Sequence, residues 1–159
     1  MPCRREGFTL VEMITVLAIF GIGSALFYTT FVNNWRILDD QLVRVNLWHD
    51  ANSIVGSVSG NGRGARTISL FEDPVSKTAT LELYDTSIVV YTMSSNGRLV
   101  MTKGGATELL TDRVDFTLSS FESFQNSLKF ILVLQDDSFG RKITATTSTQ
   151  IFPRCATCF

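Results

Sequence analysis

Residues 7–32 read GFTLVEMITVLAIFGIGSALFYTTFV, and this stretch decides how the chain is organised. From Phe8 to Phe31 the only charged side chain is that of Glu12. As a helix this segment rises about 1.5 Å per residue and measures about 36 Å, which is enough to cross a bilayer core of about 30 Å. We therefore predict a transmembrane helix over residues 8–32.

The carboxylate of Glu12 needs an explanation inside such a segment. On insertion scales, an acidic side chain costs roughly 2.5–3.5 kcal/mol near the centre of a membrane helix and less near its end. The apolar run contains no Lys, Arg or His, and the nearest basic residues, Arg4 and Arg5, lie beyond a glycine. We expect the partner of Glu12 to be created by processing or supplied by another chain.

The N-terminal sequence MPCRREG followed by FTLVEM resembles the class III leader and first helix of type IV pilins and type II secretion pseudopilins. The match runs residue by residue. Arg4 and Arg5 form a short basic leader, Gly7 stands before the cut, Phe8 becomes the new N-terminus, and Glu12 follows four residues later. The resemblance covers the leader and the apolar helix.

This resemblance implies a sequence of processing and assembly steps. Prepilin peptidase, a membrane aspartyl peptidase, removes the leader (residues 1–7) and methylates the amine of Phe8. Glu12 then neutralises the N-terminal amine of a neighbouring subunit during filament assembly. The implied partners are other pilin or pseudopilin subunits, the peptidase and the inner-membrane assembly machinery, with no cofactor and no catalytic residue.

The alternative is an ordinary secretory signal or single-pass signal anchor that carries a binding domain or an enzyme. A secretory signal has a shorter apolar region that ends at small residues. Here the apolar run continues past Ser24 and Ala25 to Val32. Because arginines beside a membrane helix stay in the cytoplasm, we expect the chain after Val32 to lie on the periplasmic or outer side of the inner membrane.

Residues 33–58 are predicted to continue the same helix into water. Apolar residues three or four positions apart form one stripe, with a longer gap before its last member: Phe31, Trp35, Leu38, Leu42, Val45, Trp48 and Val55. Four more residues widen it: Ile37, Leu47, Ala51 and Ile54. We expect this stripe to cover a sheet. Four glycines between Gly56 and Gly64 predict that the helix ends there in a loop.

The remaining residues, 59–159, are predicted to form a β-rich head, which makes the fold α+β with an antiparallel meander. Seven strands are expected: 67–71, 80–84, 88–93, 98–102, 113–121, 128–134 and 142–152. Asn96-Gly97 is the strongest hairpin signal. Between Ile88 and Leu118, and at Ile151 to Arg154, the pattern also resembles the heads of minor pilins and pseudopilins, which implies a minor subunit of a type II secretion pseudopilus or a type IV pilus.

Cysteine and histidine chemistry is sparse. Cys3 lies in the leader, whereas Cys155 and Cys158 follow the last strand, where oxidising conditions let disulfides persist. That pair is open to three interpretations: a structural disulfide, two free thiols, or a bridge to another chain. A zinc site lacks two further ligands. The single histidine, His49, is interpreted as structural, because a triad would need a serine and an acid beside it.

Two pairs of acids are weak calcium candidates, Asp136 with Asp137 and Asp112 with Asp115. Neither spacing fits an EF-hand loop, and the first pair also suits an ordinary turn. The net charge of −1 and the scattered basic residues argue against a nucleic-acid partner. No metal is predicted.

Overall fold

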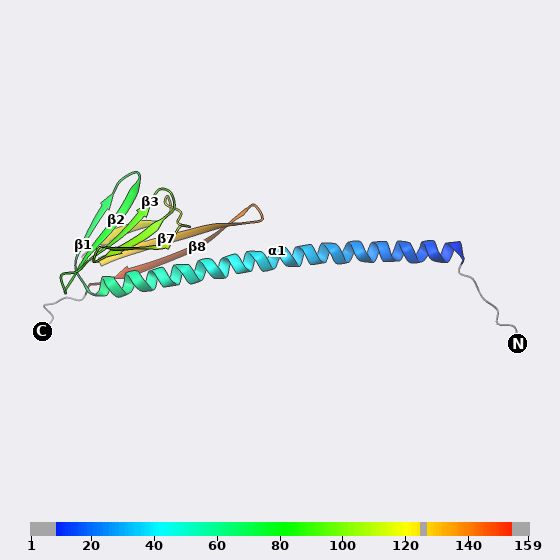
Figure 1. Cartoon of the computed structure of the whole chain (residues 1–159), viewed down its shortest axis with the longest axis horizontal. Helices are drawn as coiled ribbons and strands as arrows, with labels where there is room; N and C mark the ends of the chain where they lie inside the picture. The colour runs from blue at the N-terminus through cyan, green and yellow to red at the C-terminus, as the bar shows by residue number, and fades with distance from the viewer. Residues whose placement is uncertain (1–8, 125–126, 154–159) are drawn as a thin grey trace. The chain divides into compact units, whose positions relative to one another are not determined.

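A computed structural model describes residues 9–124 and 127–153 (Figure 1). One helix is followed by eight strands, in the order α1 (Leu10–Arg63), β1 (Ala65–Glu72), β2 (Ser76–Leu83), β3 (Ile88–Ser94), β4 (Leu99–Lys103), β5 (Ala106–Thr111), β6 (Ser120–Phe124), β7 (Ser127–Ser138) and β8 (Arg141–Ile151). The chain divides into two compact units, one ending at Asp39 and one beginning at Asp40. The second unit, which we call the head, contains both sheets and the C-terminal part of α1.

The predicted α+β fold with a long N-terminal helix is confirmed. Strands β1 to β5 form an antiparallel five-stranded sheet in chain order, and β6 to β8 form a three-stranded antiparallel sheet. The predicted turn at Asn96-Gly97 joins β3 to β4. Gly97 has a φ of +83° and its N–H donates to the carbonyl oxygen of Ser94 at 3.0 Å. Glycine suits this position because it adopts positive φ without steric cost.

Helix α1 does not end in the predicted glycine-rich loop but continues through it to Arg63. Glycine weakens an isolated helix by about 1 kcal/mol relative to alanine, so packing must hold these turns. Val58 and Gly62 are buried, and a Cβ added at Gly62 would lie only 2.8 Å from Cγ2 of Ile151 in β8. Gly62 therefore allows close contact between helix and sheet.

The buried face of α1 agrees with the predicted one only in part, because Leu47, Ala51 and Ile54 were expected in the stripe but Val58 and Gly62 were not. The residues buried in the head are Leu47, Ala51, Ile54, Val58 and Gly62, spaced three or four apart. Most of the predicted stripe, including Trp35, Leu42 and Trp48, is exposed. Ala51 and Gly62 explain the difference, because small side chains let the helix approach the sheet more closely than tryptophan would.

The predicted strand over residues 113–121 is interrupted, and β5 was not predicted. Val114 forms an isolated antiparallel bridge with Leu134 of β7. The segment that follows does not pair with β7, and pairing resumes with β6, which begins at Ser120. Asp115 and Ser119 lie at the two ends of this interruption, and both form hydrogen bonds with one residue of β7. The N–H of Asp115 donates to the carbonyl oxygen of Val133 at 2.8 Å, and the N–H of Val133 donates to Oγ of the buried Ser119 at 2.9 Å.

The segment between Asp115 and Ser119 is stabilised by hydrogen bonds to the carboxylate of Asp115. Its Oδ1 accepts hydrogen bonds from the hydroxyl of Thr117 at 2.7 Å and from the N–H groups of Thr117 and Leu118 at 3.1 and 3.2 Å. The Thr117 hydroxyl bond is the main reason why the pKa of Asp115 lies below its ordinary value. The local turn is thus set by a short polar side chain.

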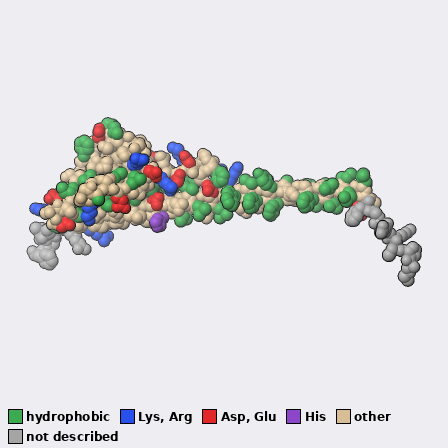
Figure 2. Space-filling view, in the orientation of Figure 1, with side chains coloured by type: hydrophobic (Ala, Val, Ile, Leu, Met, Phe, Trp, Pro, Cys, Tyr) green, Lys and Arg blue, Asp and Glu red, His purple; other side chains and the backbone are tan. Residues whose placement is uncertain are grey.

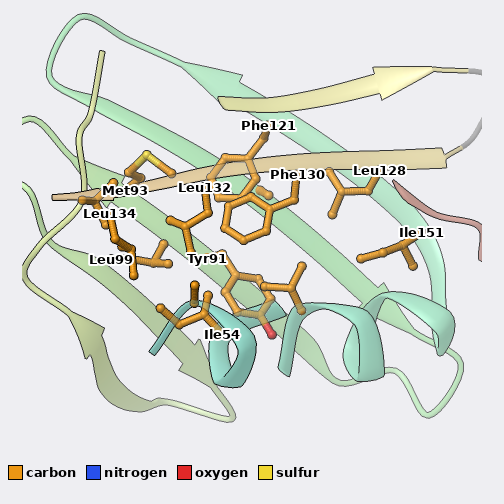
Figure 3. Packing of buried hydrophobic residues seen from close by; sticks show 14 of the residues in the cluster. Ile54, Tyr91, Met93, Leu99, Phe121, Leu128, Phe130, Leu132, Leu134 and Ile151 are labelled. Carbon is orange, nitrogen blue, oxygen red and sulfur yellow. The ribbon is translucent and has the colours of Figure 1, made fainter. Parts of the chain in front are cut away.

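The head core joins both sheets to the C-terminal part of α1 (Figure 3). Tyr91 and Phe130 are its largest fully buried side chains, and the rings of Phe121 and Phe130 stack with centroids 5.1 Å apart. The hydroxyl of Tyr91 accepts a hydrogen bond from Nδ2 of Asn61 at 2.7 Å and lies 3.2 Å from Oγ of Ser57. Helix and sheet are therefore joined by polar contacts as well as by apolar packing.

Candidate functional site

The apolar part of α1 exposes all its large side chains. From Leu10 to Phe31 every large hydrophobic residue is at least 53% exposed, and Figure 2 shows these side chains covering this part of the helix. An 18-residue window of α1 has a mean hydropathy of 2.1 and no buried residue. By length and composition, α1 is the one helix among the described residues that can cross a membrane. An apolar surface of this extent marks contact with lipid or protein.

Glu12 is bound within its own chain at the start of this segment. One carboxylate oxygen, Oε2, accepts hydrogen bonds from the backbone N–H of Thr9 at 3.0 Å and from the Thr9 hydroxyl at 3.1 Å. In return the N–H of Glu12 donates to Oγ1 of Thr9 at 3.3 Å. This is a capping box, in which the residue before the helix and the third helical residue satisfy each other's N–H groups.

The capping box changes how the lone carboxylate is understood. Sequence reasoning sought a cation from outside the chain, whereas the structure gives Glu12 two donors from Thr9. A signal for this contact was present, because Thr9-Leu10-Val11-Glu12 fits the capping pattern of Ser or Thr followed three residues later by Glu. Glu12 also lies in the first turn of α1, where the helix dipole favours negative charge. Both donors are neutral, so the negative charge itself is not neutralised.

Several predicted site residues lie outside the described part of the chain. These are Gly7 and Phe8 at the expected cleavage site and Cys155 and Cys158 near the C-terminus. Cleavage, methylation of Phe8 and the state of the two thiols therefore stay predictions.

Among the acidic calcium candidates, the carboxylate of Asp136 is engaged with protein groups. An Oδ2 atom of Asp136 lies 3.3 Å from Nη1 of Arg113, and the N–H of Asp137 donates to Oδ1 of Asp136 at 2.8 Å. With Asp112 and Asp115 they line an open polar cavity of about 810 Å³, which Arg113 and Lys142 also line. Among residues 9–124 and 127–153 no group of three His, Cys, Asp or Glu is placed to hold a metal ion.

His49 lies on α1, outside the head core. Its side chain is 84% exposed, and its Nδ1 lies 3.9 Å from Oδ1 of the next residue, Asp50. A carboxylate at this distance is a weak surface contact. Nothing in this geometry brings a nucleophile to the imidazole.

Comparison with known families identifies the N-terminal segment. The prokaryotic N-terminal methylation motif matches residues 3–28, a range that includes Gly7, Phe8 and Glu12. No curated protein and no solved structure shows a significant match to the chain. The motif implies processing by prepilin peptidase and assembly with other pilin subunits, and together with the apolar helix it is compatible with anchoring in the inner membrane. The chain therefore carries at its N-terminus the prepilin-type signal of type IV pilins and pseudopilins.

Proposed function

We propose that this protein is a structural subunit, a minor pseudopilin of a type II secretion machine or the equivalent low-abundance subunit of a type IV pilus. The observation that carries the proposal is the single carboxylate in an otherwise uncharged, exposed apolar helix within a methylation motif. The role is mechanical rather than catalytic. Before assembly, the apolar part of α1 lies in the inner membrane with the leader in the cytoplasm and the head outside it.

Assembly moves this helix from lipid into the filament core. Exposed apolar side chains between Leu10 and Phe31 then pack laterally against helices of neighbouring subunits. The carboxylate of Glu12 pairs with the methylated amine of a neighbour's Phe8 and so fixes the axial register. The Thr9 hydrogen bonds satisfy the same carboxylate while the subunit is alone, so the amine adds the positive charge that Thr9 cannot supply.

Processing is tested by mass spectrometry of the chain isolated from cells with active prepilin peptidase. We expect a mature protein that begins at N-methylated Phe8. An intact bond between Gly7 and Phe8 would instead identify an ordinary signal anchor. Cells lacking the peptidase provide the control, since the leader should remain there.

The role of Glu12 is tested with two variants that separate charge from capping. Glu12→Ala removes both, whereas Glu12→Gln keeps a side-chain oxygen that can accept the Thr9 hydrogen bonds. We expect both variants to insert in the membrane normally and to be incorporated into filaments poorly. Normal incorporation of Glu12→Gln would show that capping alone is sufficient and would overturn the pairing with a neighbour's amine.

A further inference from the structure

Helix α1 carries a row of exposed apolar side chains with a regular spacing. Its members are alternately four and three positions apart: Phe31, Trp35, Leu38, Leu42 and Val45. Each is between 56% and 64% exposed. Apolar residues that recur in this way follow the heptad pattern, which is typical of helices that pack against other helices. We call these five residues the outer row.

In the head, the outer row lies on the side of α1 that faces away from the core. Leu42 and Ala51 are nine positions apart, which at 3.6 residues per turn places them about 180° apart around the helix. Val45 stands in the same relation to Ile54. Ala51 and Ile54 are buried, whereas Leu42 and Val45 are exposed. The helix therefore has one apolar face on its own core and a second one turned away from it.

Lipid is a poor cover for the later part of the outer row. Five charged side chains lie between positions 36 and 50 of α1: Arg36, Asp39, Asp40, Arg44 and Asp50. Charged side chains are costly in the hydrocarbon core of a bilayer, so this stretch of helix belongs outside it. A row of exposed apolar side chains in water favours contact with protein.

The partner that fits the outer row is a second helix with the same row. In two parallel helices packed through heptads, the positions that flank the row on one helix meet those on the other. Asn34 would then lie beside Asp39 of a second copy, and Gln41 beside Asn46. Three of these four side chains are uncharged amides, so like charges do not meet and the amides can form hydrogen bonds between the copies.

We propose that the outer row is a contact surface for the same row in a second copy of this chain, with the two α1 helices side by side and parallel. The proposal rests on the membrane anchoring in the proposed function, because insertion of both copies in one direction makes the helices parallel. The row covers only about two heptads, which is short for a coiled coil in solution. Anchoring in one membrane offsets this by raising the effective concentration of the two copies.

Cysteine cross-linking in membranes tests this contact. The full chain, with Cys3, Cys155 and Cys158 replaced by serine, is expressed in a bacterium that has no pilins of its own. Leu42→Cys places two thiols opposite each other across the outer row. The matched control, Arg44→Cys, places an exposed thiol about 160° away around the same helix. With copper phenanthroline as the oxidant, Leu42→Cys should form dimers about fivefold faster than Arg44→Cys.

A second pair of variants tests the apolar contact itself. In a chain that carries Trp35→Cys as its only cysteine, Leu42→Lys should lower the cross-linking rate about threefold, because two lysines would face each other. Ile37→Lys is the matched control, since Ile37 is similarly exposed, at 55%, but lies off the outer row. Its cross-linking rate should not change. The melting temperature of the head should stay the same in both variants, which separates loss of contact from loss of folding.

Three results would overturn the proposal. Equal rates for Leu42→Cys and Arg44→Cys in an anchored chain would show that the outer row makes no preferred contact. An equal fall in rate for Leu42→Lys and Ile37→Lys would show that the row is not the apolar part of the contact. Extraction of the chain from the membrane by sodium carbonate would overturn the anchoring as well, and so distinguishes failure of the proposed function from failure of this contact alone.

Discussion

The two halves of α1 differ in how far their apolar side chains are exposed. Between Leu10 and Phe31 the large side chains are exposed, whereas Leu47, Ile54 and Val58 are at most 3% exposed in the head core. One helix thus contains one segment that packs on its own sheet and another that the described residues leave exposed. The contrast separates the part of α1 that is held by the head from the part for which we propose contacts with lipid and neighbouring subunits.

The largest test of this contrast replaces one leucine in each half. Leu47→Ala should lower the free energy of unfolding of the head by about 2–5 kcal/mol, because it leaves a cavity in a packed core. The matched variant Leu17→Ala, at a position 65% exposed, should change it by less than about 0.5 kcal/mol. Urea denaturation of the full chain in detergent, followed by the β-sheet circular dichroism signal, measures both. A similar loss of unfolding free energy in the two variants would contradict the contrast between the two halves of α1.

Glycines in the last turns of α1 sharpen the comparison, because only some of them touch the sheet. Gly62→Ala should destabilise the head by about 1–3 kcal/mol, since the new Cβ would lie 2.8 Å from Ile151 Cγ2. Gly60 has nothing within 4 Å of an added Cβ, so Gly60→Ala should stabilise the helix by up to about 1 kcal/mol. Melting temperatures of the two variants show whether each substitution stabilises or destabilises the protein. The reverse order would argue against close packing at Gly62.

Removing a tyrosine hydroxyl from each half of α1's surroundings tests the same contrast through a hydrogen bond, with a smaller expected change in stability. Tyr91→Phe removes the hydrogen bond from Asn61 and should cost about 0.5–1.5 kcal/mol. Tyr28→Phe, in the exposed half, should leave the head's unfolding midpoint unchanged. The measurement is again urea denaturation of the full chain. An equal shift in the two variants would show that the assay is not reporting on the head alone.

The smallest expected effect concerns two carboxylates, each bound by a nearby threonine. Glu12 is hydrogen-bonded by Thr9, and Asp115 is hydrogen-bonded by Thr117, whose hydroxyl lowers the pKa of Asp115 below its ordinary value. Because the folded-state pKa is lowered, Asp115 stabilises the head above its ordinary pKa, and this contribution is lost as the pH falls through the folded value. The difference in the free energy of unfolding between the native chain and Asp115→Asn should therefore become smaller from pH 7 to pH 3. A constant gap would contradict this.

Much of the fold follows from local pattern. The helix, the change to alternating residues and the Asn96-Gly97 turn were all predictable, because each depends on neighbours in sequence. The buried face of α1 was predictable only in part. Leu47, Ala51 and Ile54 were expected there, whereas the burial of Gly62 depends on how closely the sheet can approach the helix. The glycine-rich end of the helix was misjudged for the same reason. Helix propensity argues for a loop there, and packing against Ile151 overrides it.

Of the candidate site residues, Gly7, Phe8, Cys155 and Cys158 lie outside the described residues and stay predictions, whereas the structure describes Glu12. Glu12 was evident because one charge in an apolar run is visible without a structure. Its contact with Thr9 was not predicted, although the Thr-x-x-Glu pattern indicates it, because a lone charge in an apolar segment points to a charged partner rather than to a neighbouring hydroxyl. The interruption between Val114 and β6 was out of reach, because it depends on Ser119 meeting Val133 fourteen residues away.

The contact between Ser119 and Val133 fixes one end of a surface loop in the head. Asp115 and Ser119 both bond to Val133, so the chain leaves and rejoins β7 at a single point. The residues between them pair with no strand, and Thr117 and Leu118 are exposed. Additional residues placed here would lengthen a surface loop without shifting the strand register on either side. The head therefore has a built-in position at which related chains can acquire new surface features while keeping the same sheets.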